Sequence, residues 1–181
     1  MTFHFSSERL YFRDLQESDV NDIFELDADP EVHRYLGNRP IGTKEEALKT
    51  ILHVKKQYED KGIGRWAIVE KRSGECIGWC GFKLENRDWK EGEYYDLGYR
   101  LKRRHWGKAY GTEAAGYCLE YGFINLGLKE ICAAAHVDNL RSNNILQKLH
   151  FQIIKVFEFD DSLHNWYELS RRKFMTDKGE K

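Results

Sequence analysis

The pattern of hydrophobic and polar residues predicts one strand and two helices at the start of the chain. Residues 9–13 alternate between the two kinds, which is typical of a strand with one buried face. A helix follows with Ser18 or Asp19 as its cap, and its apolar residues recur at helical spacing. A second helix is predicted from Thr43, because Glu46 lies three residues later and completes a capping box.

The rest of the chain predicts a mixed sheet. The expected elements are strands over residues 66–70, 76–84 and 94–101, a helix over 109–124, a strand over 131–137, a helix over 139–149, and strands over 152–159 and 165–171. This order is not the regular alternation of a doubly wound fold. It predicts an α+β domain whose sheet of about seven strands is mixed, mostly antiparallel and flanked by helices.

Composition and charge narrow the class of protein. The chain has 181 residues, with 29 Lys and Arg against 30 Asp and Glu, so its formal net charge is −1. This balance excludes a broadly basic nucleic-acid coat and an acidic disordered protein. Aromatic residues make up 14% of the chain, which indicates a buried core. We predict a single domain over residues 7–175 and a disordered tail over residues 176–181.

The absence of membrane-spanning, signal-peptide and metal-ligand patterns in the sequence predicts where the protein is located and whether it binds a metal. No apolar run approaches the roughly 20 residues of a membrane-spanning helix, and the first residues show no signal-peptide pattern. The four cysteines are too few for a disulfide scaffold, and none of the seven histidines lies at zinc-ligand spacing with them. We therefore expect a cytoplasmic protein with reduced thiols, no membrane partner and no metal.

Residues 99–114 carry the clearest chemical signal. A predicted strand ends there, a basic turn follows, and Gly107, Ala109 and Gly111 open a helix. Small residues let backbone N–H groups approach a ligand, and the first helical turn leaves these donors unpaired and partly positive. Full positive charges come from Arg103, Arg104 and Lys108. The segment therefore predicts a site for phosphate or pyrophosphate.

Two common phosphate-binding motifs do not fit this segment. The Walker A motif needs Gly-Lys followed by Ser or Thr, whereas Ala109 follows Lys108. The dinucleotide fingerprint needs a middle glycine within an early βαβ unit, and here that glycine is Ala109 after mostly antiparallel strands. The alternative to a ligand site is an ordinary basic turn before a helix.

At this point the sequence resembles a known family. Arg104, Gly107 and Ala109 match the Arg/Gln-x-x-Gly-x-Gly/Ala signature of the GNAT acetyltransferases, which bind the pyrophosphate of acetyl-CoA there. Three strings are similar to the Rim-type branch that acetylates the N-termini of ribosomal proteins: residues 8–13, 106–114 and 138–142. The resemblance runs from about residue 7 to 172. It implies a GNAT fold, acetyl-CoA as the cosubstrate and N-acetyltransferase activity.

The resemblance also implies where the cofactor binds. In relatives, the strand that matches residues 99–101 separates from its neighbour, and its backbone pairs with the pantetheine arm. Asn139 matches a position whose side chain bonds the pantetheine, although Asn is also an ordinary N-cap and both roles are compatible. The implied cofactor-binding residues are Tyr99, Leu101, Arg104, His105, Trp106, Gly107, Lys108, Ala109, Tyr110, Gly111, Thr112 and Asn139.

Ser142 is the general acid that the resemblance implies. It matches the serine of an Asn-x-x-Ser motif that is proposed in relatives to protonate the leaving thiolate. Many other GNAT enzymes use a Tyr four residues before a Gly-Phe pair, but Leu146 stands at the tyrosine position and His150-Phe151 replaces Gly-Phe. His tolerates the left-handed backbone of that glycine better than most residues. The alternative is that Ser142 bonds only backbone in the first helical turn.

Asp96 is the first candidate for the general base or the acceptor anchor. An amine of lysine type has a pKa near 10 and attacks only when neutral, so a carboxylate can take its proton directly or through water. Asp96 precedes the phosphate turn at a position where Rim-type relatives often carry Glu, and it shares a strand face with Gly98 and Arg100. The alternative is a cross-strand surface carboxylate.

The acceptor is predicted from the resemblance to be the primary amine of a protein N-terminus. A small cationic amine, such as a polyamine or an aminoglycoside, is the alternative. It is suggested by acidic residues that also fit ordinary solvated loops: Glu85, Asp88, Glu91, Glu93, Asp96 and Asp160-Asp161.

Two non-enzymatic alternatives stay open. An RNA-binding module would use the basic residues around Trp106, but a single short patch offers few phosphate contacts, so nucleic acid is not expected. An inactive GNAT domain that only senses acetyl-CoA is the other. Exposed aromatic residues would permit a homodimer.

Overall fold

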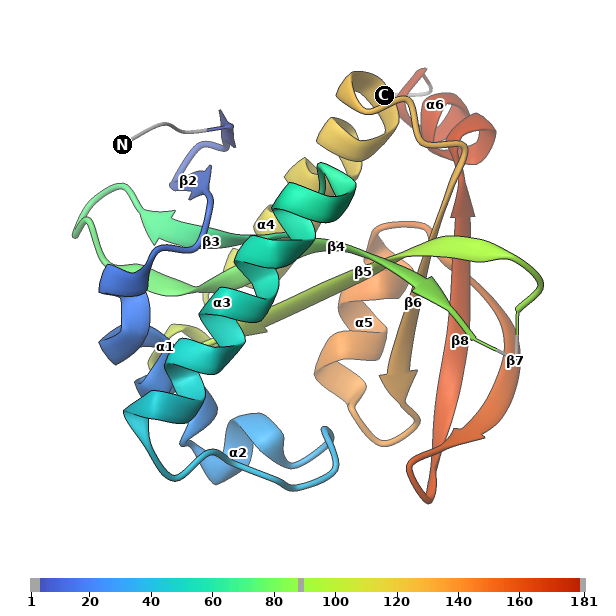
Figure 1. Cartoon of the computed structure of the whole chain (residues 1–181). Helices are drawn as coiled ribbons and strands as arrows, with labels where there is room; N and C mark the ends of the chain where they lie inside the picture. The colour runs from blue at the N-terminus through green and yellow to red at the C-terminus, as the bar shows by residue number, and fades with distance from the viewer. Residues whose placement is uncertain (1–3, 88–89, 180–181) are drawn as a thin grey trace.

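The computed structural model describes residues 4–87 and 90–179 (Figure 1). Its strands and α-helices are, in chain order, β1 (Phe5–Ser6), β2 (Leu10–Arg13), α1 (Val20–Asp27), α2 (Pro30–His33), α3 (Lys44–Lys61), β3 (Arg65–Glu70), β4 (Cys76–Asn86), β5 (Glu93–Leu101), α4 (Tyr110–Glu120), β6 (Glu130–His136), α5 (Leu140–Lys148), β7 (Gln152–Phe159), β8 (Ser162–Ser170) and α6 (Arg171–Gly179). Short 3-10 turns cover Glu17–Asp19 and Arg103–His105, and a π-helical turn over Tyr121–Asn125 extends α4.

The strands form one eight-stranded sheet in the order β1-β2-β3-β4-β5-β6-β8-β7. Every neighbouring pair is antiparallel except β5 and β6, which are parallel. The predicted α+β class with a mixed, mostly antiparallel sheet is therefore confirmed. The strand count exceeds the expected seven because the two-residue β1 adds an edge that no sequence period could indicate.

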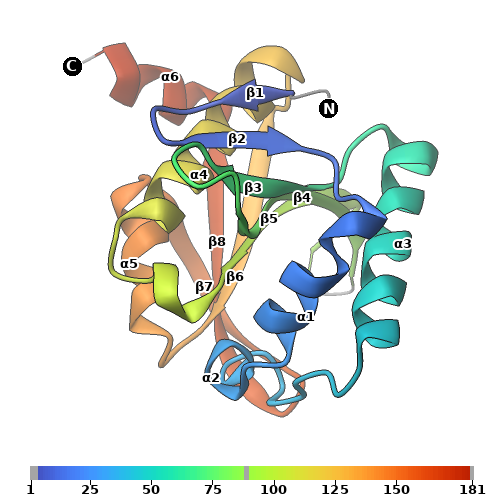
Figure 2. The same cartoon turned by 90° about the vertical axis from the view of Figure 1, so that its left-hand side faces the viewer.

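Helices cover both faces of the sheet, as Figure 2 shows. On one face α4 and α5 pack against β4, β5 and β6 through Ala114, Cys118 and Leu146. On the other face α1 and α3 pack against β3 and β4 through Ile23 and Ile51. We call these the α4/α5 face and the α1/α3 face. The sheet thus separates two surfaces that carry different side chains.

Local sequence signals explain how the first helices begin. Thr43 caps α3, and its side chain and that of Glu46 form the predicted capping box. Asp19 stands at the N-cap position of α1, but its carboxylate accepts two hydrogen bonds from Arg13 at 2.7 Å instead of capping the helix. Arg13 and Asp19 are both buried, so this pair fixes α1 against the end of β2.

A disordered tail was predicted over residues 176–181, but the structure describes a helix, α6, that extends to Gly179. Lys173 and Asp177, one helical turn apart, form an ion pair of 3.0 Å. Phe174 contacts the ring of Phe123 with centroids 4.9 Å apart. These contacts order a segment whose composition suggested fraying, and the last two residues lie outside the described part of the chain.

No helix among the described residues is long and apolar enough to cross a bilayer.

Candidate active site

The sheet splits between β5 and β6. These two strands register at a single pair, Asp96 with Cys132, among the described residues. Beyond Asp96, the residues from Leu97 to Leu101 keep their antiparallel partners on β4 but have no registered partner on β6 in the described chain. Backbone groups on that side of β5 can therefore pair with a ligand. This matches the separation expected for the strand that carries Tyr99 and Leu101.

An exposed turn joins the split strand to α4. After the 3-10 turn, the indole Nε1 of Trp106 donates to the carbonyl of Leu101 at 2.7 Å and holds the turn against the strand end. Gly107 and Ala109 then adopt left-handed conformations, with φ of 74° and 64°. Residues 107–109 are exposed and α4 begins directly after them. The turn thus presents open backbone next to a helix N-terminus, as the phosphate prediction requires.

Two of the basic side chains of this turn are paired with carboxylates of the protein and are not free to bind a phosphate. Arg104 pairs with Glu25 of α1 and Glu75 of the β3–β4 turn. Arg103 pairs with Asp29 at 3.0 Å. The charge of these arginines is therefore largely balanced, and the signature Arg104 supports the turn from behind. Its contribution to a ligand would come from the backbone.

Lys102 is the functional neighbour that sequence reasoning missed. Its side chain is only 2% exposed, and its ammonium bonds Asp22 at 2.6 Å and Glu75 at 2.7 Å. Burial opposes the charged form, but these carboxylates prevail and raise its pKa. A lysine within a basic run carries no sequence signal for burial. The structure shows that it anchors the start of the phosphate turn to α1.

Of the remaining predicted cofactor-binding residues, some are buried beneath the turn and others lie in the first turn of α4. His105 is buried, and burial lowers its pKa, so its imidazole is neutral and adds no cation to the turn. Tyr110 is buried and its hydroxyl bonds Glu70. A Cβ on Gly111 would lie 3.0 Å from Ile145 Cδ1, so the glycine allows α4 and α5 to pack closely here. Thr112 is half-buried in the first turn of α4.

Ser142, Tyr99 and Asn139 come together on the α4/α5 face. The hydroxyl groups of Tyr99 and Ser142 are hydrogen-bonded at 2.9 Å. The Asn139 side chain accepts from the backbone N–H of Ser142 at 3.2 Å, which confirms its N-cap role for α5. Burial raises the pKa of Tyr99, so its phenol stays protonated. The serine therefore has a fixed hydroxyl partner next to the split strand.

A buried asparagine supports this group and was also missed from the sequence. The amide nitrogen of Asn143 donates to the carbonyls of His136 and Asn139, both at 2.9 Å. Its oxygen accepts from Tyr167 at 2.6 Å and from Asn165 at 2.9 Å. The fully bonded side chain ties the end of β6 and the start of α5 to β8. In the sequence, Asn143 is one of several polar residues in this segment, and no pattern indicates that it is buried.

Asp96 lies on the opposite, α1/α3 face. Its carboxylate is 3.4 Å from the guanidinium of Arg65, which stacks over Trp79 at 4.6 Å. Burial raises the pKa of Asp96, and the charge of Arg65 offsets part of that effect. Arg100 shares this face and bonds Asp27 of α1 at 2.5 Å. A half-buried carboxylate with a raised pKa at the split is a candidate base.

The two predicted catalytic residues are therefore separated by the sheet. Ser142 approaches the split from the α4/α5 face, and Asp96 stands at the last paired position on the α1/α3 face. If the acyl donor and the amine acceptor enter from opposite faces, the donor would contact Ser142 and the acceptor would contact Asp96.

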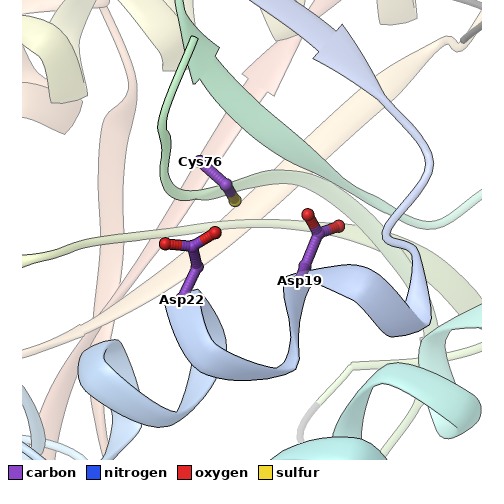
Figure 3. A group of neighbouring side chains, drawn as sticks. All are labelled: Asp19, Asp22 and Cys76. Carbon is purple, nitrogen blue, oxygen red and sulfur yellow. The ribbon is translucent and has the colours of Figure 1, made fainter. Parts of the chain in front are cut away.

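Among the described residues, three groups of acidic residues, two of which include a cysteine, cluster closely enough to hold a metal ion in principle. Figure 3 shows the one formed by Asp19, Asp22 and Cys76, whose side chains converge from the start of α1 and the beginning of β4. Here Asp19 is bonded by Arg13 and Asp22 by Lys102. Burial raises the pKa of the Cys76 thiol to about 12, so it stays protonated. The protein's own cations therefore balance this cluster.

Comparison with known proteins matches this geometry to a family. The model of the acetyltransferase (GNAT) domain matches residues 9–152. The uncharacterized N-acetyltransferase p20 of Bacillus licheniformis is 32% identical over 146 residues, which cover 81% of this chain and 80% of that protein. The uncharacterized N-acetyltransferase YoaA of Bacillus subtilis is 32% identical, with 81% of each chain covered.

Solved structures share the fold at low sequence identity. A GNAT-family acetyltransferase from Bordetella pertussis superposes with a TM-score of 0.79 and 19% identity, covering 92% of this chain and 98% of that one. The spermidine N-acetyltransferase of Vibrio cholerae gives 0.77 and 18%, covering 93% and 98%. The ribosomal-protein-S5-alanine acetyltransferase of Vibrio fischeri gives 0.72 and 17%, covering 94% and 97%. The chain therefore belongs to the GNAT family and is an acetyl-CoA-dependent N-acetyltransferase.

Proposed function

We propose that this enzyme acetylates the α-amine of a protein or peptide N-terminus. Acetyl-CoA would bind on the α4/α5 face and the acceptor amine on the α1/α3 face. The observation that carries the proposal is the position of Asp96, a half-buried carboxylate at the point where β5 and β6 part. It faces away from the Tyr99–Ser142 pair and toward the face on which an acceptor can approach.

The residues of the α4/α5 face fit acetyl-CoA. The exposed backbone of residues 107–109 and the first turn of α4 would hold the pyrophosphate. The unpaired side of β5 at Tyr99 and Leu101 would pair with the amide-rich pantetheine arm. Asn139 keeps its N-cap bond and can offer its amide nitrogen to the same arm. Acetyl-CoA supplies the acetyl group as an activated thioester.

Proton transfer at the two faces completes the reaction. Asp96, directly or through water, takes a proton from the acceptor ammonium and frees the nitrogen lone pair for attack on the acetyl carbon. Backbone N–H groups at the split polarise the acetyl carbonyl. When the C–S bond breaks, the Ser142 hydroxyl gives its proton to the sulfur and regains one through water as the acetylated nitrogen releases its extra proton. The Tyr99 hydroxyl, 2.9 Å away, holds Ser142 in place. The acetyl group passes directly to nitrogen, without an acyl-enzyme.

The charges near the split favour a single amine over a polycation. Most of the acidic residues that suggested a small cationic acceptor are paired within the described chain: Glu85 with Lys83 and Arg87, Glu93 with Lys61, Asp96 with Arg65, and Asp160 with Arg39. Asp88 lies outside the described residues. A polyamine would have to displace several of these cations. An N-terminal α-amine needs only one carboxylate, and its lower pKa leaves more of it neutral at pH 7.

A matched acceptor panel tests the proposal. Purified protein and acetyl-CoA are incubated with peptides that begin with Ala or Ser, with the same peptides blocked at the N-terminus, and with spermidine. We expect thiol release and a one-acetyl mass increase with the free peptides only. Rapid turnover of spermidine together with inert peptides would contradict the N-terminal acceptor and leave the polyamine alternative.

A further inference from the structure

The segment before β2 contacts the phosphate turn, although about a hundred residues separate them in sequence. Ser7 Oγ donates to Glu113 Oε1 at 2.6 Å, and the backbone N–H of Arg9 donates to the same oxygen at 2.9 Å. Arg9 Nε donates to Glu113 Oε2 at 2.6 Å. Glu113 lies in the first turn of α4, so residues 7–9 contact the helix that follows the phosphate turn.

Arg9 also reaches the turn itself. Its Nη1 donates to the backbone carbonyl of Lys108 at 3.1 Å. Its guanidinium stacks over the ring of Tyr110, 4.3 Å from the centroid. One side chain therefore contacts the residues on both sides of Ala109.

This contact fixes the direction of one backbone donor. In a trans peptide the C=O of Lys108 and the N–H of Ala109 point in opposite directions. Because Arg9 holds the carbonyl, the Ala109 N–H faces away from Arg9, on the open side of the turn. Ala109 is also left-handed, with φ of 64°, a state that costs a non-glycine residue about 1 kcal/mol. Such a conformation persists only when its surroundings hold it.

Arg9 also neutralises the negative charge of Glu113 at the N-terminus of α4. A carboxylate in the first turn of α4 interacts with the same partial positive charge that would attract a phosphate. Burial opposes ionisation of Glu113, but hydrogen bonds from Ser7 and Arg9 outweigh it and lower its pKa, so Glu113 is ionised. The guanidinium of Arg9 neutralises that charge within the pair.

We infer that Arg9 is a positioning residue for the diphosphate of the acyl donor. It acts through the Lys108 carbonyl and Glu113, and it holds residues 107–109 in the conformation whose amides face the ligand. The inference rests on the donor site of the proposed function. It adds a residue that no part of the phosphate motif contains.

Two acyl donors separate positioning at the phosphates from a general loss of structure. Acetyl-CoA carries the diphosphate, and acetyl-pantetheine carries the same thioester without it. KM and kcat are measured for both donors in the wild type, Arg9→Gln, Arg9→Lys and a control, Arg72→Gln, which removes an exposed arginine from the β3–β4 turn. The peptide acceptor is held at saturation throughout.

We expect Arg9→Gln to raise KM for acetyl-CoA about tenfold, with kcat within about twofold and acetyl-pantetheine kinetics unchanged. A factor of ten is what the loss of one charged hydrogen bond to a binding turn produces. Arg9→Lys keeps the charge but lacks the forked donors, so it should fall between the wild type and Arg9→Gln. Arg72→Gln should match the wild type with both donors.

Equal losses with both donors, or an unchanged KM for acetyl-CoA, would overturn the inference. If Arg9→Gln does not fold, Arg9→Lys gives the same comparison. If the wild type shows no preference for acetyl-CoA over acetyl-pantetheine, the proposed diphosphate site is contradicted, and the inference about Arg9 is contradicted with it. A wild type with that preference and an Arg9→Gln variant that retains it would reject only the role of Arg9.

Discussion

At the scale of single residues, the hydrogen bond between Tyr99 and Ser142 gives the predicted general acid a hydroxyl partner. Leu146 occupies that tyrosine position and is buried in the core. A phenol is nevertheless near the serine, because β5 supplies it from the sheet. The sequence motif located Ser142, but only the fold shows that Tyr99 is its partner.

Ser142→Ala should lower kcat about a hundredfold, the lower range for loss of a general acid, with little change in KM for acetyl-CoA. Tyr99→Phe should cost less, since it removes only the group that orients the serine. Both are measured as thiol release at saturating donor and acceptor. Ser170→Ala, which removes an exposed hydroxyl at the end of β8, is the control. A kcat of Ser142→Ala equal to that of the control would exclude the serine as the acid.

Asp96 should determine the acidic limb of the pH profile. The carboxylate must be ionised to take a proton, so activity is present above its pKa and is lost as pH falls through it. Because burial raises this pKa above the ordinary 3.8, the loss begins at a higher pH than for an exposed aspartate. Asp96→Asn should lower kcat/KM for the peptide at least tenfold and abolish this limb. The same limb in Asp96→Asn would assign it to another group.

At the scale of elements, the end of α5 shows how a departure from the family pattern is accommodated. His150 follows α5 in a left-handed conformation with φ of 64°, the state that a glycine adopts without strain. The backbone N–H of Phe151 donates to the Leu146 carbonyl at 3.1 Å and closes the helix. The turn therefore keeps its geometry with histidine, as the sequence had suggested.

His150→Gly should stabilise the protein by about 1 kcal/mol, because it removes the left-handed strain of a residue with a Cβ. Loss of the 3.5 Å contact between His150 and Asp177 would offset part of that gain. Denaturant unfolding measures the change, with kcat/KM as a control that should not move. A destabilised variant would show that the histidine contact outweighs the strain.

Elements with strong periodicity or caps were predictable, and short elements were not. The α3 helix has both the Thr43 capping box and a long apolar stripe. By contrast, α2 has four residues and β1 has two, which is too short for a hydrophobic pattern to repeat. The π-helical turn after α4 also carried no signal, because its sequence continues the same helix. The site depends on α4 and α5, which were both predicted.

At the scale of the whole molecule, contacts between distant segments neutralise charges that look available in the sequence. The basic run before α4 suggested a cationic pocket, yet Lys102 and Arg104 are paired with carboxylates from α1 and the β3–β4 turn. The acidic residues Glu85 on β4 and Glu93 at the start of β5 are likewise paired with two lysines and an arginine. Spacing along a chain cannot show such pairs. The anion-binding character of the turn therefore comes mainly from backbone N–H groups and the helix N-terminus.

Direct binding of the donor tests the account at this scale. Isothermal titration of purified protein with acetyl-CoA should show saturable binding at micromolar concentration with one site per chain. The complex should release free thiol when an Ala-starting peptide is added. Absence of binding at that concentration would contradict the acetyl-CoA site at the β5–β6 split, and with it the central claim.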